Sequence, residues 1–258
     1  MQVEESPSIL KTKTASGEPV IAVSNVSIAF GNNQVLNNFN LILYKGENLA
    51  VLGKSGSGKS VLIKCIIGLL KPDEGDINVL GENVAALEQE SLDALRVKIG
   101  FLFQSNALYD SMTVRENLEF PLRRHGVDLS QTEIDALVIE ALENVGLRHT
   151  VNMMPVELSG GMRKRIALAR TLILKPEIIL YDEPTTGLDP ITGKEISLLM
   201  VEIQKKYNTS SLIITHDMNC VRRTADRVAI LLDGRCYAEG IFKDLEQSKD
   251  KAIKQFFE

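Results

Sequence analysis

The clearest chemistry in this sequence lies in a glycine-rich loop at residues 53–60. The loop reads Gly53, Lys54, Ser55, Gly56, Ser57, Gly58, Lys59, Ser60. An apolar run precedes it at 49–52 and another follows at 61–63, which predicts a strand, a loop and a helix in succession. In this setting the spacing G-x-x-x-x-G-K-S is typical of a phosphate-binding loop, whereas a flexible Gly/Ser linker would lack the flanking apolar runs.

Each residue type in this loop has a task in holding phosphate. Glycines let backbone N–H groups point at the phosphates, and the helix that begins near Gly58 adds its positive N-terminal end. The Lys59 ammonium would reach the β- and γ-phosphates, and the Ser60 hydroxyl would bind Mg²⁺. We therefore expect the loop to bind a nucleotide together with Mg²⁺.

Two adjacent carboxylates, Asp182 and Glu183, follow the apolar run 178–181. A phosphate-loop NTPase holds Mg²⁺ with an Asp at the end of such a strand, and Asp182 fits that role. Glu183 is then placed to polarise water for attack on the γ-phosphate. An ordinary strand end is the alternative, but the phosphate loop in the same chain favours the catalytic interpretation.

Three further side chains stand where a nucleotide site would use them. Gln104 and His216 each follow a short apolar run that predicts a strand. Ligands of open α/β sheets bind at the carboxyl ends of strands. Gln104 could therefore contact Mg²⁺ or the attacking water, and we expect His216 to sense the γ-phosphate. Phe30 is either an adenine-stacking ring or a core aromatic, and its spacing does not decide between them.

A second anion-binding feature lies at residues 158–162, Leu-Ser-Gly-Gly-Met. Ser159 has the chemistry of an N-cap for a helix expected at 163–174, and the paired glycines leave backbone N–H groups uncovered. This helix is basic, and its pattern favours a solvated face over a nucleic-acid surface. The basic residues are Arg163, Lys164, Arg165 and Arg170.

The elements that must position these groups follow from hydrophobic periodicity. A capping box at Ser130–Glu133 begins a helix that Gly146 ends, inside a region that is helical in character from about 105 to 175. Strands are predicted at 21–28, 35–43, 49–52, 76–80, 99–103, 178–182, 211–214, 228–232 and 235–239. Strands interleaved with helices predict an α/β fold.

Composition bounds the partners of the chain. Its 258 residues, 44% of them hydrophobic, suit one large domain or a core with a smaller subdomain. A net charge of −5 argues against a nucleic-acid partner, and no apolar run approaches the ~18 residues of a membrane span. The three cysteines form no C-x-x-C pair, which fits reduced thiols. His125 and His149 have no partner at metal spacing, so we expect them on the surface.

Taken in order, the motifs resemble those of the ATP-binding subunit of an ABC transporter, over about residues 20–245. The matching motifs are the phosphate loop, the Q-loop Gln104, the signature 158–162, the Walker B pair Asp182 and Glu183, the D-loop 187–189 and the switch His216. The resemblance implies a P-loop NTPase fold with a mixed sheet core, an antiparallel β subdomain and a helical subdomain at about 105–175. Residues 1–19 and 246–258 would be tails. Phe30 matches the A-loop aromatic of the family, which favours adenine stacking.

The resemblance also implies a homodimer that binds two ATP molecules with Mg²⁺. Two subunits would pack head to tail, so that Ser159, Gly160 and Gly161 of one cap the ATP on the phosphate loop of the other, with Asp189 of the D-loop nearby. Hydrolysis would open the dimer and drive a separate membrane permease. Met162 stands where Gln is usual, so the polar contact of that Gln is not expected here.

One branch of the family matches the sequence in more detail. Residues 103–117, and LSGGM with 163–165, resemble the ATPases of MCE-associated (Mla-type) lipid transporters, with Tyr109 where Phe is typical. This implies phospholipid or other apolar cargo, a permease whose coupling helix docks on 105–117, an MCE-type lipid-binding protein and a small regulatory subunit. The location would be the cytoplasmic face of a bacterial inner membrane.

Other interpretations remain open at this stage. An ABC ATPase for an amino acid or a metal shares most of the motifs. A non-transport ABC ATPase in DNA repair or translation would carry coiled-coil insertions or a second cassette. A small-molecule kinase with the same phosphate loop gives no account of residues 158–162.

Overall fold

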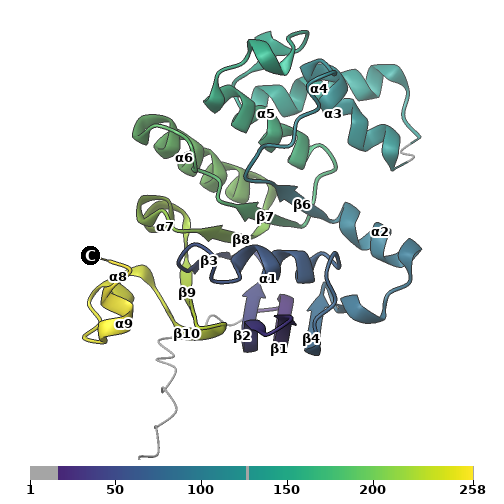
Figure 1. Ribbon diagram of the computed structural model, residues 1–258. Coiled ribbons are helices and arrows are strands. Elements are labelled where there is room, and N and C mark those ends of the chain that lie inside the picture. Colours follow the sequence, from purple (N-terminus) through teal and green to yellow (C-terminus); the bar gives the residue numbers. More distant parts are fainter. Residues whose placement is uncertain (1–16, 126–127, 258) are drawn as a thin grey trace, which may run out of the picture. The chain divides into compact units, whose positions relative to one another are not determined.

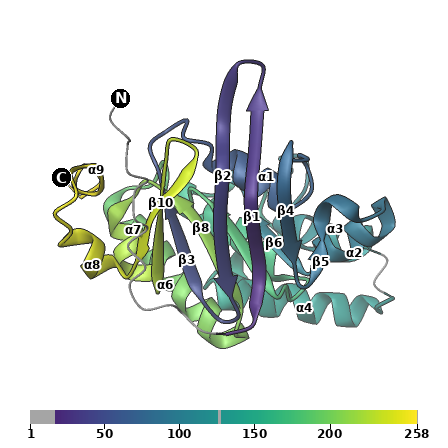
Figure 2. The ribbon, with the colours of Figure 1, turned by 90° about the horizontal axis from the view of Figure 1, so that it is seen from below.

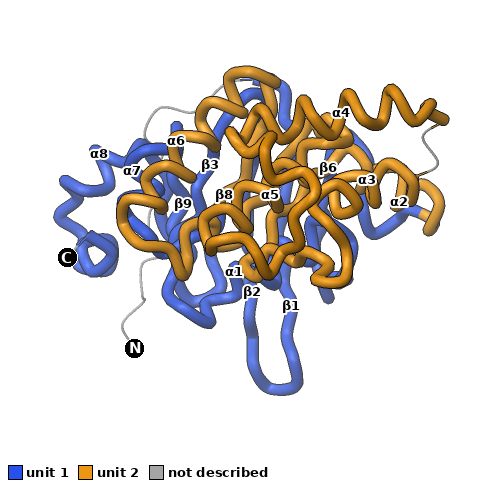
Figure 3. Tube along the Cα trace, turned by 90° about the horizontal axis from the view of Figure 1, so that it is seen from above, with its two compact units in different colours: residues 1–87, 214–258 blue, residues 88–213 orange. Residues whose placement is uncertain are grey.

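The computed structural model describes residues 17–125 and 128–257. The chain forms two compact units (Figure 3): residues 1–87 with 214–258 are unit 1, and residues 88–213 are unit 2. Residues 1–16 of the expected N-terminal tail lie outside the described residues.

Unit 1 contains an antiparallel sheet with the strand order β2-β1-β4-β5. Its strands are β1 (Pro19–Phe30), β2 (Asn33–Tyr44), β4 (Glu74–Val79) and β5 (Glu82–Asn83). Figure 2 shows β1 and β2 as a long hairpin. The apolar residues predicted from alternation along β1, such as Ile21 and Val23, are buried, so the hairpin has a core face.

The remaining strands of unit 1 are ordered β10-β9-β3. They are β3 (Asn48–Leu52), β9 (Arg227–Leu232) and β10 (Arg235–Gly240), with β3 parallel and β10 antiparallel to β9. Every residue of β3 is buried, as expected of a continuous apolar strand covered on both faces. The helices are α1 (Lys59–Ile66), α7 (Met218–Thr224), α8 (Phe242–Glu246) and α9 (Lys251–Lys254). The sequence pattern did not predict α7, α8 or α9.

Unit 2 carries the strands β6, β7 and β8 and most of the long helices (Figure 1). The strands are β6 (Ile99–Leu102), β7 (Ile178–Asp182) and β8 (Ser210–Thr215), whose last two residues belong to unit 1; β6 and β7 are parallel. The helices are α2 (Gln89–Val97), α3 (Val114–Arg124), α4 (Gln131–Asn144), α5 (Gly160–Leu172) and α6 (Pro190–Tyr207).

Helix boundaries show where local chemistry decides. The capping box at Ser130 and Glu133 is confirmed at the start of α4. The helix predicted at 163–174 instead begins three residues earlier, at Gly160, because Ser159 caps it directly. Within the described residues, no helix combines the length and apolar content needed to cross a membrane.

A buried ion cluster ties the strands of unit 1 together. Arg227 at the start of β9 is 7% exposed and binds Glu47, which is 8% exposed, at 2.7 Å from Nε to Oε1. Its guanidinium also donates to Glu239 on β10 and to the carbonyl of Ile42 on β2. Burial alone would lower the pKa of Arg227, but the hydrogen bond to Glu47 and the charge of Glu239 raise it above its usual range. The cluster therefore keeps its charges paired while joining β2, β9 and β10.

We predict that Arg227→Met destabilises the protein by about 3–5 kcal/mol, because Glu47 is left as a buried charge without its partner. Urea unfolding measures the loss. Arg235→Met is the matched control, since Arg235 is exposed on the neighbouring strand. Arg227→Met combined with Glu47→Gln should regain part of the loss. A change no larger than that of the control would contradict a stabilising role for the cluster.

Candidate functional site

The predicted phosphate loop joins β3 to α1, so the expected succession of strand, loop and helix is confirmed. Gly58 has φ of 102°, in the left-handed region that favours glycine. A Cβ at this position would lie 2.8 Å from Val35 Cγ1 and 3.0 Å from the carbonyl oxygen of Val35. Glycine is therefore required here both by the backbone angle and by the close approach to β2.

The side chains of the loop are poised for phosphate. Lys59 is buried, and its ammonium donates to the carbonyl oxygens of Gly53 at 2.7 Å and Lys54 at 3.0 Å. Ser60 is exposed in the first turn of α1. Gly56 has φ of 78° with open space where a Cβ would be. The carbonyl oxygens of Gly53 and Lys54 thus accept hydrogen bonds from the Lys59 ammonium, and phosphate oxygens could replace them. The residues of the loop therefore fit a phosphate group.

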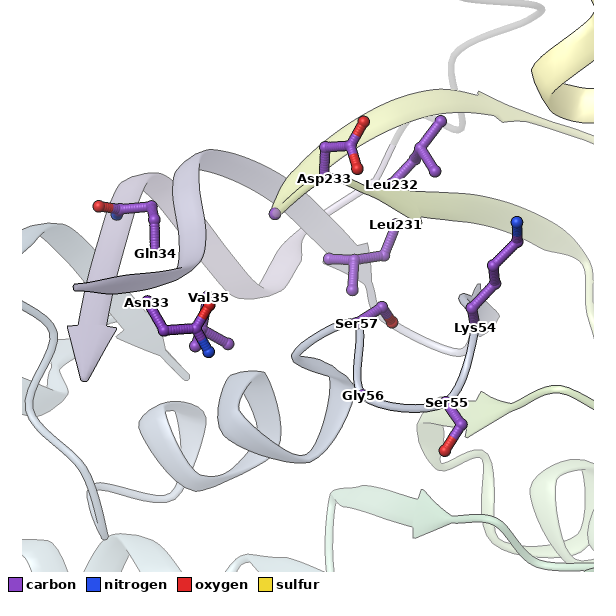
Figure 4. Close-up of a pocket in the computed structure, with 11 residues that line it drawn as sticks. Asn33, Gln34, Val35, Lys54, Ser55, Gly56, Ser57, Leu231, Leu232 and Asp233 are labelled. Carbon is purple, nitrogen blue, oxygen red and sulfur yellow. The ribbon is translucent and has the colours of Figure 1, made fainter. Parts of the chain in front are cut away.

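A pocket of about 270 Å³ adjoins this loop (Figure 4). It is lined by residues 33–35 of β2, 54–57 of the phosphate loop and 231–234 of the turn between β9 and β10. Figure 4 shows Lys54 and Ser55 pointing in opposite directions from the loop. The sequence pattern did not predict residues 33–35 or 231–234 as part of the site. The only local sign of this region is the Asp233-Gly234 pair, which is typical of a hairpin turn.

Phe30 lies at the end of β1, directly paired with Asn33 across the hairpin. Asn33 lines the pocket beside the phosphate loop, and the Phe30 ring is 51% exposed. A core aromatic would be buried, so the exposure of Phe30 favours the stacking interpretation over the core one.

A different pocket, of about 580 Å³, lies at the end of α4 and is lined by Glu143, Gly146, Arg148 and His149. None of the predicted site residues line it.

The carboxylates of unit 2 stand at the end of β7, as predicted. Four residues of β7 are buried and the fifth, Asp182, is partly buried. Glu183 is 8% exposed and has φ of 49°, a left-handed backbone that a side chain adopts only at some cost. Thr186 Oγ1 donates to Glu183 Oε2 at 3.3 Å. The turn after β7 therefore holds the Glu183 carboxylate in a defined place.

The signature residues begin α5, and the N-cap prediction for Ser159 is confirmed by a 3.2 Å hydrogen bond that Ser159 Oγ accepts from the Met162 N–H. Gly160 is exposed. Gly161 is packed, because a Cβ there would lie 2.6 Å from Thr192 Cγ2 on α6. The first turn of α5 therefore combines an exposed glycine backbone with a tight contact to α6.

The D-loop residue Asp189 belongs to the same arrangement. It caps α6 by accepting from the N–H groups of Ile191 and Thr192, and it accepts from Thr192 Oγ1 at 2.6 Å. The side-chain hydrogen bond from Thr192 is the main reason that the pKa of Asp189 is lowered. Thr192 thus connects the D-loop to the signature glycine that it packs against.

The prediction of a solvated basic face on α5 is wrong for Lys164. Its side chain is 1% exposed, and Nζ donates to the carbonyl oxygen of Gln104 at 3.1 Å. Burial lowers the pKa of Lys164 to about 8, and the charge of Asp182 opposes part of that shift. Arg170, further along α5, binds the carbonyls of Asn106 and Ala107. The helix is packed on this side, and Lys164 and Arg170 donate hydrogen bonds to backbone carbonyls of the loop that follows β6.

The predicted site residues divide between the two units. Unit 1 holds the phosphate loop, Phe30 and His216, which is exposed just past β8. Unit 2 holds the others: Gln104, Ser159, Gly160, Gly161, Asp182, Glu183 and Asp189. The predicted metal ligands Ser60, Gln104 and Asp182 offer hydroxyl, amide and carboxylate oxygens, the donors that Mg²⁺ prefers. His125 and His149 are exposed, as predicted.

Comparison with known proteins agrees with these motifs. The family described as "ABC transporter" matches residues 36–186. The intermembrane phospholipid transport system ATP-binding protein MlaF of Haemophilus influenzae is 39% identical over 92% of this chain and 89% of its own length. MlaF of Escherichia coli K12 is 36% identical over 93% of this chain and 88% of its length. The methionine import ATP-binding protein MetN of Rhizobium johnstonii is 38% identical over 89% of this chain but only 63% of its own length.

Solved structures show the same fold. The ATP-binding cassette MJ0796, a dimer bound to ADP and phosphate in a post-hydrolysis state, is similar with a TM-score of 0.78 and 34% identity, covering 86% of this chain and 98% of that one. CbiO1 of Clostridium perfringens, part of an ABC transporter complex, has a TM-score of 0.82 and 31% identity over 92% of this chain and 94% of its own. The expected α/β fold of a phosphate-loop cassette is confirmed. The chain therefore belongs to the ABC transporter family, as one of its ATP-hydrolysing subunits.

Proposed function

We propose that this chain powers phospholipid transport in a bacterial envelope, working as a homodimer on a separate integral-membrane permease at the cytoplasmic face of the inner membrane. An MCE-type lipid-binding protein and a small regulatory subunit complete the proposed complex. The observation that carries the proposal is near end-to-end similarity to two MlaF proteins, which are named for intermembrane phospholipid transport.

The share of each relative's length that this chain covers favours phospholipid over an amino acid as the cargo. The MetN relatives have almost the same identity, but this chain spans less than two thirds of their length. It spans nearly nine tenths of the MlaF proteins. The similarity therefore supports phospholipid as the cargo above an amino acid.

The residues of unit 1 bind the nucleotide in the proposed mechanism. Phe30 stacks on the adenine, and the loop from Gly53 to Gly58 surrounds the phosphates with N–H groups. Lys59 exchanges its two carbonyl partners for phosphate oxygens, and Ser60 supplies an oxygen ligand to Mg²⁺. Mg²⁺, when bound, neutralises the charge that develops on the phosphates during transfer.

The residues of unit 2 act on the γ-phosphate and on the partner subunit. Asp182 and Gln104 complete the metal ligands, and Glu183 orients the attacking water. The exposed first turn of α5, at Ser159, Gly160 and Gly161, places its N-terminus against the ATP of the other subunit, with Asp189 of the D-loop beside it. His216 contacts the γ-phosphate. The segment 105–117 receives the permease.

We predict that Glu183→Gln binds ATP normally, lowers turnover by roughly 10²–10⁴-fold and accumulates an ATP-bound dimer, because a carboxamide cannot take up a proton. Steady-state ATPase assays and size-exclusion chromatography with ATP measure both effects. Glu177→Gln, an exposed site just before β7, is the control. Normal turnover in Glu183→Gln would remove this residue from the reaction.

Lys59→Ala should weaken ATP binding by roughly 10–100-fold, the cost of a charge-assisted hydrogen bond of about 1.5–3 kcal/mol. Equilibrium titration with a fluorescent ATP analogue gives the dissociation constant. Lys64→Ala, at an exposed lysine of the same helix, should bind as the parent does. Unchanged binding in Lys59→Ala would contradict the phosphate-loop assignment.

Affinity purification of the tagged chain from detergent-solubilised membranes tests the cargo. We expect recovery of a multi-span permease with bound phospholipid, detected by mass spectrometry of proteins and lipids. Recovery with an amino-acid-binding protein would favour the alternative cargo, and recovery with DNA or ribosomes would contradict a transport function.

A further inference from the structure

Lys164 is a buried cation that none of the motifs accounts for. It lies on α5 behind the signature residues and is 1% exposed, among the largest fully buried side chains of the described residues. An ammonium is seldom buried unless it is paired, because water solvates it strongly. The buried Lys164 ammonium therefore needs hydrogen-bond or charged partners that compensate for its lost hydration.

The partners of Lys164 come from two proposed catalytic segments. Nζ donates to the backbone oxygen of Gln104 at 3.1 Å, and Asp182 is the carboxylate whose charge acts on the ammonium. Strands β6 and β7 are parallel neighbours in which Leu102 pairs with Tyr181. The ends of these two strands therefore lie side by side, and the Lys164 ammonium is hydrogen-bonded to the backbone at Gln104, just past one of them.

The other cations of α5 show that this placement is specific. Arg163 donates to the carbonyl of Leu158, and Arg165 pairs with Glu195 at 2.8 Å. Neither of these contacts involves Gln104. Arg170 assists Lys164 by binding the carbonyls of Asn106 and Ala107 at 3.1 and 2.8 Å. These two residues have φ of 64° and 50°, so the loop after Gln104 has a backbone shape that must be held by its surroundings.

We propose that Lys164 is a positioning residue of the ATPase site, which holds the backbone at Gln104 and the carboxylate of Asp182 in place for the magnesium-bound nucleotide. The inference rests on the metal roles proposed for Gln104 and Asp182. It assigns to Lys164 the work of an outer-shell partner, which orients ligands without touching the metal or the substrate. It also makes α5 a physical link between the signature and both segments.

The test compares Lys164→Met, which removes the charge and the donor, with Lys164→Gln, which keeps a donor without the charge. We measure the Mg²⁺ concentration for half-maximal binding of a fluorescent ATP analogue, kcat and KM for ATP, and the melting temperature. Lys205→Met, at an exposed lysine of α6, is the matched control. For Lys164→Met we expect the Mg²⁺ requirement to rise and kcat to fall by about 10–100-fold, as for other outer-shell partners.

The expected pattern separates positioning from a structural role. Binding of the analogue at saturating Mg²⁺ and the KM for ATP should stay near the parent values, because the phosphate loop belongs to unit 1. Lys164→Gln should recover part of kcat through a hydrogen bond to the Gln104 carbonyl. Parent-like Mg²⁺ dependence and kcat in Lys164→Met overturn the proposal. If Lys164→Met does not fold, Lys164→Gln decides by the same criterion, and failure of both to fold assigns Lys164 a structural role and overturns it.

Asp182→Asn distinguishes failure of the inference from failure of the proposed site. If Asp182→Asn raises the Mg²⁺ requirement and Lys164→Met does not, only the inference about Lys164 fails. If Asp182→Asn leaves the Mg²⁺ requirement unchanged, the proposed metal role of Asp182 fails and the inference fails with it. In the combined variant, the effect of Lys164→Met on the Mg²⁺ requirement should be smaller than in the parent, because the carboxylate it positions is absent.

Discussion

Close approach of the phosphate loop to strand β2 constrains much of unit 1. Gly58 leaves no room for a side chain against Val35, and Gly234 leaves none against the same strand, where its Cβ would lie 2.9 Å from the carbonyl oxygen of Val35. The Gly234 carbonyl also accepts from the Asn37 N–H at 2.9 Å. The loop, the turn between β9 and β10 and the β1–β2 hairpin are thereby held together. That contact defines the walls of the pocket and brings the end of the hairpin, with Phe30, to the same region.

In unit 2, helix α5 likewise combines an exposed first turn with close contacts to neighbouring segments. The first turn of the helix exposes Gly160, while Gly161 allows α6 and the D-loop cap to pack directly on it. Further along, Lys164 and Arg170 turn inward and satisfy the carbonyls of a loop that leaves the regular strand. Hydrogen bonds from a charged donor are stronger than neutral ones, so these contacts hold the backbone of the loop in place. One helix therefore exposes its first turn at Gly160 and supports the backbone that follows β6.

Two buried cations of unit 1, Arg227 and Lys59, have different kinds of partner, which distinguishes a stabilising role from a phosphate-binding one. Arg227 and Glu47 are buried, paired with each other and not part of any of the motifs, so they serve stability. Lys59 is also buried, but its partners are backbone oxygens of a loop with open space at Gly56. These carbonyl oxygens are neutral, so phosphate oxygens can replace them around the Lys59 ammonium, because hydrogen bonds between charged groups are stronger.

Local patterns could predict the phosphate loop, the carboxylates at the end of β7, the cap at Ser159 and the strands that carry them, because each depends on neighbours within a few residues. The role of Lys164 could not be predicted in this way. In the sequence it is one of several basic residues of α5, and only the packing of α5 against the end of β6 buries it. The pocket walls at 33–35 and 231–234, and the contact between Gly161 and Thr192, likewise join residues far apart in the chain. Hydrophobic periodicity and capping chemistry are local, whereas these contacts depend on which elements meet in space, and that is decided only when the whole chain packs.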